Sequence, residues 1–193
     1  MKLNLGCGFK KKSDFVNVDR SKTYEPNVIV DLVKDTWPWE DSSVTEVWFE
    51  FSLEQMGSTV EDLKKILCEL YRVCGEGAAV KIFAFHPRHD DFVLNPLCVH
   101  RLSPQFFSYL SLQGNLQQIA NGQLGNSLSF EWGVNFEMSL ARPHLSLHLK
   151  EMVEAGHLSE IDLQEKLLLE NNICHVMEFD LKVVKLSDRE NKR

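Results

Sequence analysis

Two glycines and one carboxylate near the start of the chain have types and spacing suited to binding a nucleoside. The segment from Lys2 to Gly8 reads KLNLGCG, an apolar run that ends in Gly6-Cys7-Gly8, and a second run, FVNVD, ends in Asp19. In an α/β sheet both runs would end at the edge where ligands bind. The glycines allow a ligand to approach the backbone closely. The carboxylate can accept hydrogen bonds from a ribose diol, each worth roughly 1.5–3 kcal/mol.

The spacing of these residues indicates which class of nucleoside ligand the site can bind. A dinucleotide fingerprint requires a third glycine where this chain has Lys11, and Asp19 follows Gly8 too closely for a full helix and a second strand. A pyrophosphate would need the helix N-terminus that this spacing leaves out, and no G-K-[ST] follows the glycines, which excludes a P-loop. The pattern therefore favours a ligand with a ribose and no phosphates, such as S-adenosylmethionine. The alternative is that both glycines form only a tight turn after a buried strand.

Composition limits the classes of protein that need to be considered. The chain has 193 residues, 44% of them hydrophobic, which suits a single domain with a sizeable core. Its 28 acidic and 21 basic residues give a net charge of −7, which argues against a nucleic-acid partner. The five cysteines form no C-x-x-C pair, so neither a metal site nor a disulfide framework is predicted, and reduced thiols suit a cytoplasmic location. We expect no export and no membrane span, because signal-peptide and long apolar patterns are missing.

The elements that must position these residues follow from periodicity and turn signals. Strands are predicted over 3–5, 15–19, 28–31, 44–51, 78–85, 130–140 and 176–186. Helices are predicted over 63–74, with a capping box of Ser58 and Glu61, and over 103–112, 143–155 and 161–171. A loop rich in Gly, Asn and Gln is predicted over 114–125, where it could close as a lid. Together these elements predict one α/β domain over 1–193 with a mostly parallel sheet, residues 1–85 serving the cofactor and 86–186 the substrate.

Several motifs in this order resemble the class I S-adenosylmethionine-dependent methyltransferases, in particular the compact methyltransferase-type-11-like proteins. The matching segments are KLNLGCG, FVNVD, the Asp31-Leu32 pair, WPWEDSSVTEV, FSLEQ and LYRVCGEG. The resemblance implies a three-layer Rossmann-like fold with an antiparallel last strand, and S-adenosyl-L-methionine as the cofactor. It implies that the Gly6-Cys7-Gly8 turn approaches the methionine part of the cofactor and that Asp19 holds the ribose. It further places the following residues at the adenine or on the floor of the site: Asp31, Leu32, Phe51 and Ser52.

The segment after the strand over 78–85 supplies the candidate acceptor site. The related proteins often carry D-P-T-H-x-R there, whereas this chain has Asn95-Pro96-Leu97-Cys98-Val99-His100, and Gln55 stands at another usual histidine position. A hydroxyl or amine acceptor needs a base within hydrogen-bond reach. His86 and His100 are the leading candidates, with three further residues and one earlier carboxylate behind them: His89, Asp90, Asp91 and Glu54.

Two functions of different classes follow from these residues. The first is methyl transfer from S-adenosylmethionine to a hydroxyl or amine of a small molecule or sugar. The second is a catalytically reduced protein of the same fold that binds the cofactor or a partner. A third hypothesis, an NAD-dependent oxidoreductase, is disfavoured, because the third glycine of the dinucleotide fingerprint is missing and Asp19 follows Gly8 too closely for the helix of that fold. The oligomeric state is not indicated.

Overall fold

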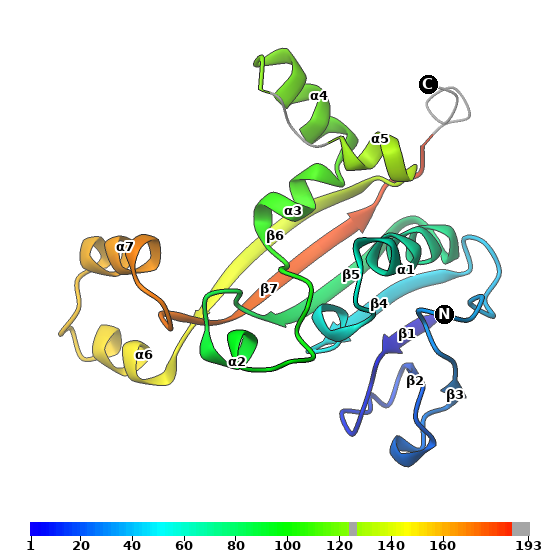
Figure 1. Cartoon of the computed structure of the whole chain (residues 1–193), viewed down its shortest axis with the longest axis horizontal. Coiled ribbons are helices and arrows are strands. Elements are labelled where there is room, and N and C mark those ends of the chain that lie inside the picture. Colours follow the sequence, from blue (N-terminus) through cyan, green and yellow to red (C-terminus); the bar gives the residue numbers. More distant parts are fainter. Residues whose placement is uncertain (124–126, 187–193) are drawn as a thin grey trace.

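The chain folds around one seven-stranded sheet. In the computed structural model, which describes residues 1–123 and 127–186, the strand order is β3-β2-β1-β4-β5-β7-β6 (Figure 1). The first five strands in this order are parallel, and β7 runs antiparallel to both of its neighbours. The predicted mostly parallel sheet with an antiparallel last strand is therefore confirmed. The strands are β1 (Lys2–Leu5), β2 (Val16–Asp19), β3 (Val28–Ile29), β4 (Val44–Glu50), β5 (Cys74–Phe85), β6 (Phe136–Leu145) and β7 (Cys174–Val183).

The longest helix packs on the sheet through one apolar face. Helix α1 (Val60–Val73) buries the side chains spaced at helical intervals along it, namely Leu63, Ile66, Leu67, Leu70 and Val73. Its capping box consists of Thr59 and Asp62, one residue later than predicted. The Asp62 carboxylate accepts from the backbone N–H groups of both Ser58 (2.8 Å) and Thr59 (3.1 Å), and the Thr59 hydroxyl accepts from Asp62 N at 3.1 Å.

Shorter helices follow β5. They are α2 (Asp90–Val93), α3 (Pro104–Tyr109), α4 (Leu112–Ala120) and α5 (Leu128–Trp132). The predicted loop over 114–125 is wrong where α4 lies, and residues 124 and 125 are outside the described residues. The Ser111 hydroxyl caps α4 by accepting from Gly114 N at 3.1 Å, and the buried Asn115 amide donates to Tyr109 O at 2.9 Å. These bonds and the good helix formers between them outweigh the glycine and asparagine.

The two faces of the sheet are covered differently. One face carries the core, including Leu5, Phe49 and Ile82, all fully buried. The connection from β1 to β2 is a loop, and that from β2 to β3 contains only the 3₁₀ helix η1 (Lys22–Tyr24), so no helix from these connections covers the second face. On that face Ala79 is exposed although β5 is a central strand. The helical layer of the predicted three-layer fold is thus reduced on this side.

Cations and aromatic rings cover much of this second face. Lys12 Nζ lies 3.7 Å from the centroid of the Trp48 ring, and Trp48 stacks on Phe83 at 5.6 Å. Lys81 Nζ lies 3.4 Å from a carboxylate oxygen of Glu178 and 3.2 Å from one of Asp180. Cation–π contacts and ion pairs therefore take the place of apolar helix packing here.

A two-helix insertion separates the last two strands. Helices α6 (Leu147–Glu154) and α7 (Glu160–Leu169) lie beyond the ends of β6 and β7 (Figure 1), and we call residues 146–173 the α6–α7 arm. The arm has its own small apolar cluster of Leu149, Leu158 and Ile173. Because Phe85 pairs with Val176, the arm lies at the carboxyl end of β5. Among the described residues, no helix has the length and apolar character needed to cross a membrane.

Candidate functional site

A cavity of about 540 Å³ opens at the carboxyl ends of β1, β2 and β4. This is the edge at which α/β sheets bind ligands, and the volume lies in the range of small-molecule sites. It brings together seven of the eight residues predicted for the cofactor, from four separate segments. They are Gly6, Gly8, Asp19, Asp31, Leu32, Phe51 and Ser52.

The two glycines of the β1–β2 turn are required for different reasons. Both have positive φ, +67° at Gly6 and +47° at Gly8. A Cβ on Gly6 would lie 2.7 Å from both Ser52 Cβ and Met56 Cε, so this position must stay bare for the floor of the cavity to close. A Cβ on Gly8 would meet nothing within 4 Å. The bare backbone of Gly8 therefore faces open space, where a ligand can approach it.

Asp19 joins this turn to the end of β2. Its side chain is buried, and Oδ2 accepts from Gly8 N at 3.0 Å while Oδ1 accepts from Ser21 N at 2.9 Å. A carboxylate offers about four acceptor positions. Two of them therefore hold the turn in place, and the others are available to donors in the cavity.

An asparagine network takes over the role that a helix would have between β1 and β2. Asn4 Nδ2 donates to Asn17 Oδ1 (2.9 Å) and to Lys10 O (2.8 Å), and Asn17 Nδ2 donates to Asn27 Oδ1 (3.0 Å). Lys12 N also donates to Asn17 Oδ1, at 2.8 Å. Buried amides of this kind satisfy the backbone of the loop over 9–15 and hold it against the sheet.

The segment after β3 also lines the cavity, through Val30, Asp31, Leu32 and Val33. Asp31 Oδ1 accepts from Val33 N (3.0 Å) and Lys34 N (3.2 Å), so this carboxylate closes a tight turn while it also lines the cavity. The Trp37 indole N–H donates to Leu32 O at 3.0 Å. The position of Leu32 therefore depends on where Trp37 is anchored.

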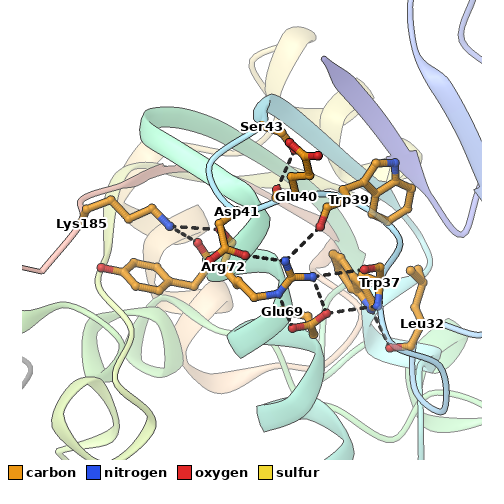
Figure 2. Close-up of polar contacts among 10 residues, drawn as sticks. Leu32, Trp37, Trp39, Glu40, Asp41, Ser43, Glu69, Arg72 and Lys185 are labelled. Carbon is orange, nitrogen blue, oxygen red and sulfur yellow. Dashed lines mark hydrogen bonds and ion pairs between the residues drawn. The ribbon is translucent and has the colours of Figure 1, made fainter.

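Arg72 of α1 provides that anchor, as Figure 2 shows. Its guanidinium donates to the carbonyls of Trp37 (3.2 Å) and Trp39 (2.9 Å) and to the carboxylates of Asp41 and Glu69 (both 2.7 Å). Trp37 N donates to the same Glu69 carboxylate, at 3.1 Å. Both indoles are buried, with ring centroids 5.8 Å apart, and neither lines the cavity. The two tryptophans therefore anchor the loop after β3.

The floor of the cavity carries a strained residue. Phe51 directly follows β4 and has φ +54°, which is unusual for a bulky side chain and typical of functional sites. Its N–H donates to Phe83 O at 2.8 Å, and its ring packs on Phe85 at 4.7 Å. Ser52 Oγ donates to Leu5 O at 2.9 Å, which ties the floor to β1.

Sequence reasoning missed several residues that line the cavity. These are Arg20, Ser21, Tyr24, Val30, Val33, Gln55, Met56, Gly57 and Leu97. Tyr24 makes an edge-to-face contact at 4.8 Å with Phe9, whose side chain is 80% exposed beside the glycine turn. The only sequence feature that could have indicated the Phe9–Tyr24 pair is the aromatic residue directly after Gly8, because the periodicity of the sequence does not explain an apolar residue at that position.

Cys7, His86 and His100 do not line this cavity. Cys7 is buried, and burial raises the pKa of its thiol. His100 Nε2 lies 2.7 Å from Met56 O, and the ring borders a second cavity of about 360 Å³ beside α1 and α3. His86 is half-buried, and its Nδ1 accepts from Arg88 N at 3.2 Å. Burial lowers the pKa of both imidazoles, so both favour the neutral form.

Glu54 is a buried carboxyl group immediately behind the floor. It lies in the 3₁₀ helix η2 (Leu53–Gln55), its Oε1 accepts from Phe85 N at 3.3 Å, and its Oε2 has no hydrogen-bond partner among the described residues. Burial raises its pKa to about 7. Its backbone carbonyl accepts from Val99 N and His100 N, which attaches the segment containing Leu97 to the edge of the cavity.

The strand order, the direction of β7 and the cavity beside β1 and β2 together define the Rossmann-like fold of the class I S-adenosylmethionine-dependent methyltransferases. The predicted resemblance is confirmed at the level of the fold. No protein-family model matches the chain, and a comparison with curated protein sequences finds no significant match.

Solved structures of low sequence identity share this fold. A methyltransferase from Methanosarcina mazei is 12% identical with a TM-score of 0.55, the match covering 96% of this chain and 92% of the other. A methyltransferase from Archaeoglobus fulgidus is 16% identical with a TM-score of 0.53, and the match covers 94% of this chain and 85% of the other. The [4+2]-cyclase SpnF is 12% identical with a TM-score of 0.50, and the match covers 96% of this chain and 75% of the other.

Proposed function

We propose that this protein binds S-adenosylmethionine in the 540 Å³ cavity and transfers a methyl group to a hydroxyl or amine of a small molecule. The observation that carries the proposal is the pairing of Gly8 with Asp19 at the mouth of the cavity: a backbone position open to a ligand is hydrogen-bonded to a buried carboxylate that keeps acceptor capacity. Neither phosphate-binding glycines nor a helix N-terminus accompanies this pair, which favours a nucleoside without phosphates.

The donor set of the cavity suits this cofactor. Asp19 would accept from the ribose hydroxyls, and Asp31 with Leu32 would meet the adenine. The glycine turn, Phe51 and Ser52 would surround the methionine part. The bound cofactor would supply an electrophilic methyl group on a sulfonium. The role of the protein is to hold the acceptor in line with the methyl group and to exclude water. Holding two reactants in the right geometry lowers the activation barrier by about 7–11 kcal/mol in favourable cases.

The acceptor would enter between the segment over 51–57 and that over 86–101, and the base comes from this second segment. His86 is our first candidate, because it directly follows β5 and its ring makes a single hydrogen bond among the described residues, from Arg88 N to Nδ1. This bond places the proton of the neutral ring on Nε2, so His86 would take up a proton at Nδ1 once the bond from Arg88 N is released. His100 is better suited to positioning, since its Nε2 is held by Met56 O at the cavity wall.

In an active enzyme, His86→Ala should lower turnover, as a radiolabelled methyl-transfer assay would measure, while leaving cofactor affinity nearly unchanged. Full turnover in this variant would place the base elsewhere.

The alternative is a protein that binds the cofactor without methyl transfer. It is favoured by one observation, that neither predicted base lines the cavity. The [4+2]-cyclase of the same fold also illustrates that this architecture hosts other chemistry. Cofactor binding without release of S-adenosylhomocysteine, across a panel of hydroxyl and amine acceptors, would favour this alternative.

Calorimetric titration with S-adenosylmethionine and S-adenosylhomocysteine tests cofactor binding. We expect both to bind, and we expect Asp19→Asn to raise the dissociation constant about 10- to 150-fold, because one charged acceptor worth roughly 1.5–3 kcal/mol is lost. Asp14→Asn is the matched control, since it removes the same charge from an exposed position in the loop between β1 and β2. No heat and no thermal shift with either ligand at millimolar concentration would overturn the proposal. Equal affinities of the two variants would reduce Asp19 to a turn residue.

A further inference from the structure

Two imidazoles and a carboxylate meet at the carboxyl end of β5, outside the cavity. One potential ligand atom from each of His89, Asp91 and His175 lies within 4.8 Å of the other two. Asp91 Oδ2 is 2.7 Å from His175 Nε2 and 3.6 Å from His89 Nδ1, and the two rings lie 4.7 Å apart. No local sequence pattern indicates this group, because His175 is 84 residues away from Asp91.

The scaffold holds these side chains together through bonds that do not involve them. The Arg88 guanidinium donates to carbonyls at the end of α7, among them Leu168 O at 3.0 Å. Asn172 N donates to Arg88 O at 3.0 Å, and its side chain accepts from Asp90 N at 2.8 Å. His86 N donates to His175 O at 2.9 Å. The segment over 86–91 and the end of the α6–α7 arm are therefore already fixed against each other.

We propose that His89, Asp91 and His175 bind a divalent transition-metal ion, with Zn²⁺ as the best fit. Two imidazoles and one carboxylate are a donor set that suits Zn²⁺ and Co²⁺ better than Mg²⁺ or Ca²⁺. Ligand atoms of a tetrahedral zinc site with bonds of 2.0–2.1 Å lie about 3.3 Å from one another. The distances of 2.7 and 3.6 Å fall on either side of this value, so small side-chain movements close the site.

Binding would change two existing hydrogen bonds. The ion replaces the proton shared between Asp91 and His175, and His89 Nδ1 exchanges its bond from Asp91 N (3.1 Å) for a bond to the metal. All three residues are accessible enough for an ion to enter, with side-chain exposures of 16%, 52% and 40% for His89, Asp91 and His175. Three protein ligands leave a fourth position for water. The ion would cross-link the start of β7, directly after the α6–α7 arm, to the segment that follows β5.

Co²⁺ and Zn²⁺ titrations of the chelator-treated full chain, without cofactor, test this site independently of the proposed function. We expect the visible absorption bands of four-coordinate Co²⁺ without a thiolate-to-cobalt band, displacement of Co²⁺ by Zn²⁺, and no response to Mg²⁺. Asp91→Asn and His175→Gln should each weaken Co²⁺ binding about tenfold or more. His89→Asn should do the same while keeping a side-chain cap for α2.

His157→Gln is the matched control, since this exposed histidine lies in the α6–α7 arm away from the group. It should bind Co²⁺ as the parent chain does, and far-ultraviolet circular dichroism checks that every variant folds. A thiolate-to-cobalt band, no visible bands, or equal loss of affinity in the control and the site variants would overturn the proposal.

Discussion

Raising the pH from about 4.5 to about 7 is expected to lower the free energy of unfolding by ~3 kcal/mol through Glu54 alone. The unfolded chain releases this proton near pH 4.5, whereas the folded chain holds it until about pH 7, because burial disfavours the carboxylate. The folded state therefore binds more protons between these values. The stabilisation is complete below pH 4.5 and is lost as the pH rises through the folded pKa.

Chemical denaturation of the parent chain and Glu54→Gln across pH 4 to 8 measures this effect. The difference between the two isolates Glu54 from carboxylates whose pKa is lowered and whose contribution has the opposite sign, such as Glu69 beside Arg72. We expect the variant to gain stability relative to the parent as the pH rises. Glu61→Gln, on the exposed side of α1, should leave the pH dependence unchanged. Parallel curves for the parent and Glu54→Gln would show that Glu54 titrates normally.

Arg72→Ala is expected to lower the free energy of unfolding by about 2–4 kcal/mol, because it leaves the Trp37 and Trp39 carbonyls and the Glu69 carboxylate without their shared donor. Since Trp37 positions Leu32, cofactor affinity should fall as well. Denaturant unfolding and calorimetry measure the two effects.

Two further variants sharpen this prediction. Arg72→Lys should recover only a small part of the stability, because an ammonium cannot reproduce the planar fork. Lys65→Ala removes a cation from the exposed side of the same helix, where its single hydrogen bond goes to Lys34 O, and should cost less than about 1 kcal/mol. Equal losses for Lys65→Ala and Arg72→Ala would contradict the anchoring role of Arg72.

Local patterns in the sequence were sufficient to predict a mostly parallel sheet and the pairing of the glycine turn with Asp19. Strand β1 is a short run followed by Gly6, and β2 is a short run that ends in Asp19. The ends of parallel strands meet at one edge, so Gly8 and Asp19 could be placed together. The resemblance to the methyltransferases added Asp31, Leu32 and Phe51. The roles of all these residues in binding stay predictions.

What the sequence could not predict depends on contacts between distant segments. The asparagine network links positions 4, 17 and 27, and Arg72 reaches carbonyls more than 30 residues away, with no periodic signal in either case. The position of His100 behind Met56 depends on how the segment over 86–101 folds back on η2. The sequence does not predict helix α4, because Gly114 and Asn115 disfavour a helix and the hydrogen bonds that offset them are evident only in the folded chain.

The short connections among the first three strands have a consequence for folding kinetics. Leu3 of β1 pairs with Val16 of β2, and Val18 of β2 with Val28 of β3, so these pairings close loops of about a dozen residues or fewer. By contrast Val80 of β5 pairs with Leu181 of β7, about 100 residues further on. Contact order is thus lowest where the glycine turn and Asp19 lie, and loop-closure entropy falls mainly on the other half of the sheet. The pairings of β1, β2 and β3 that carry the glycine turn and Asp19 can therefore form by local steps, whereas the pairing of β5 with β7 requires the closure of a much longer loop.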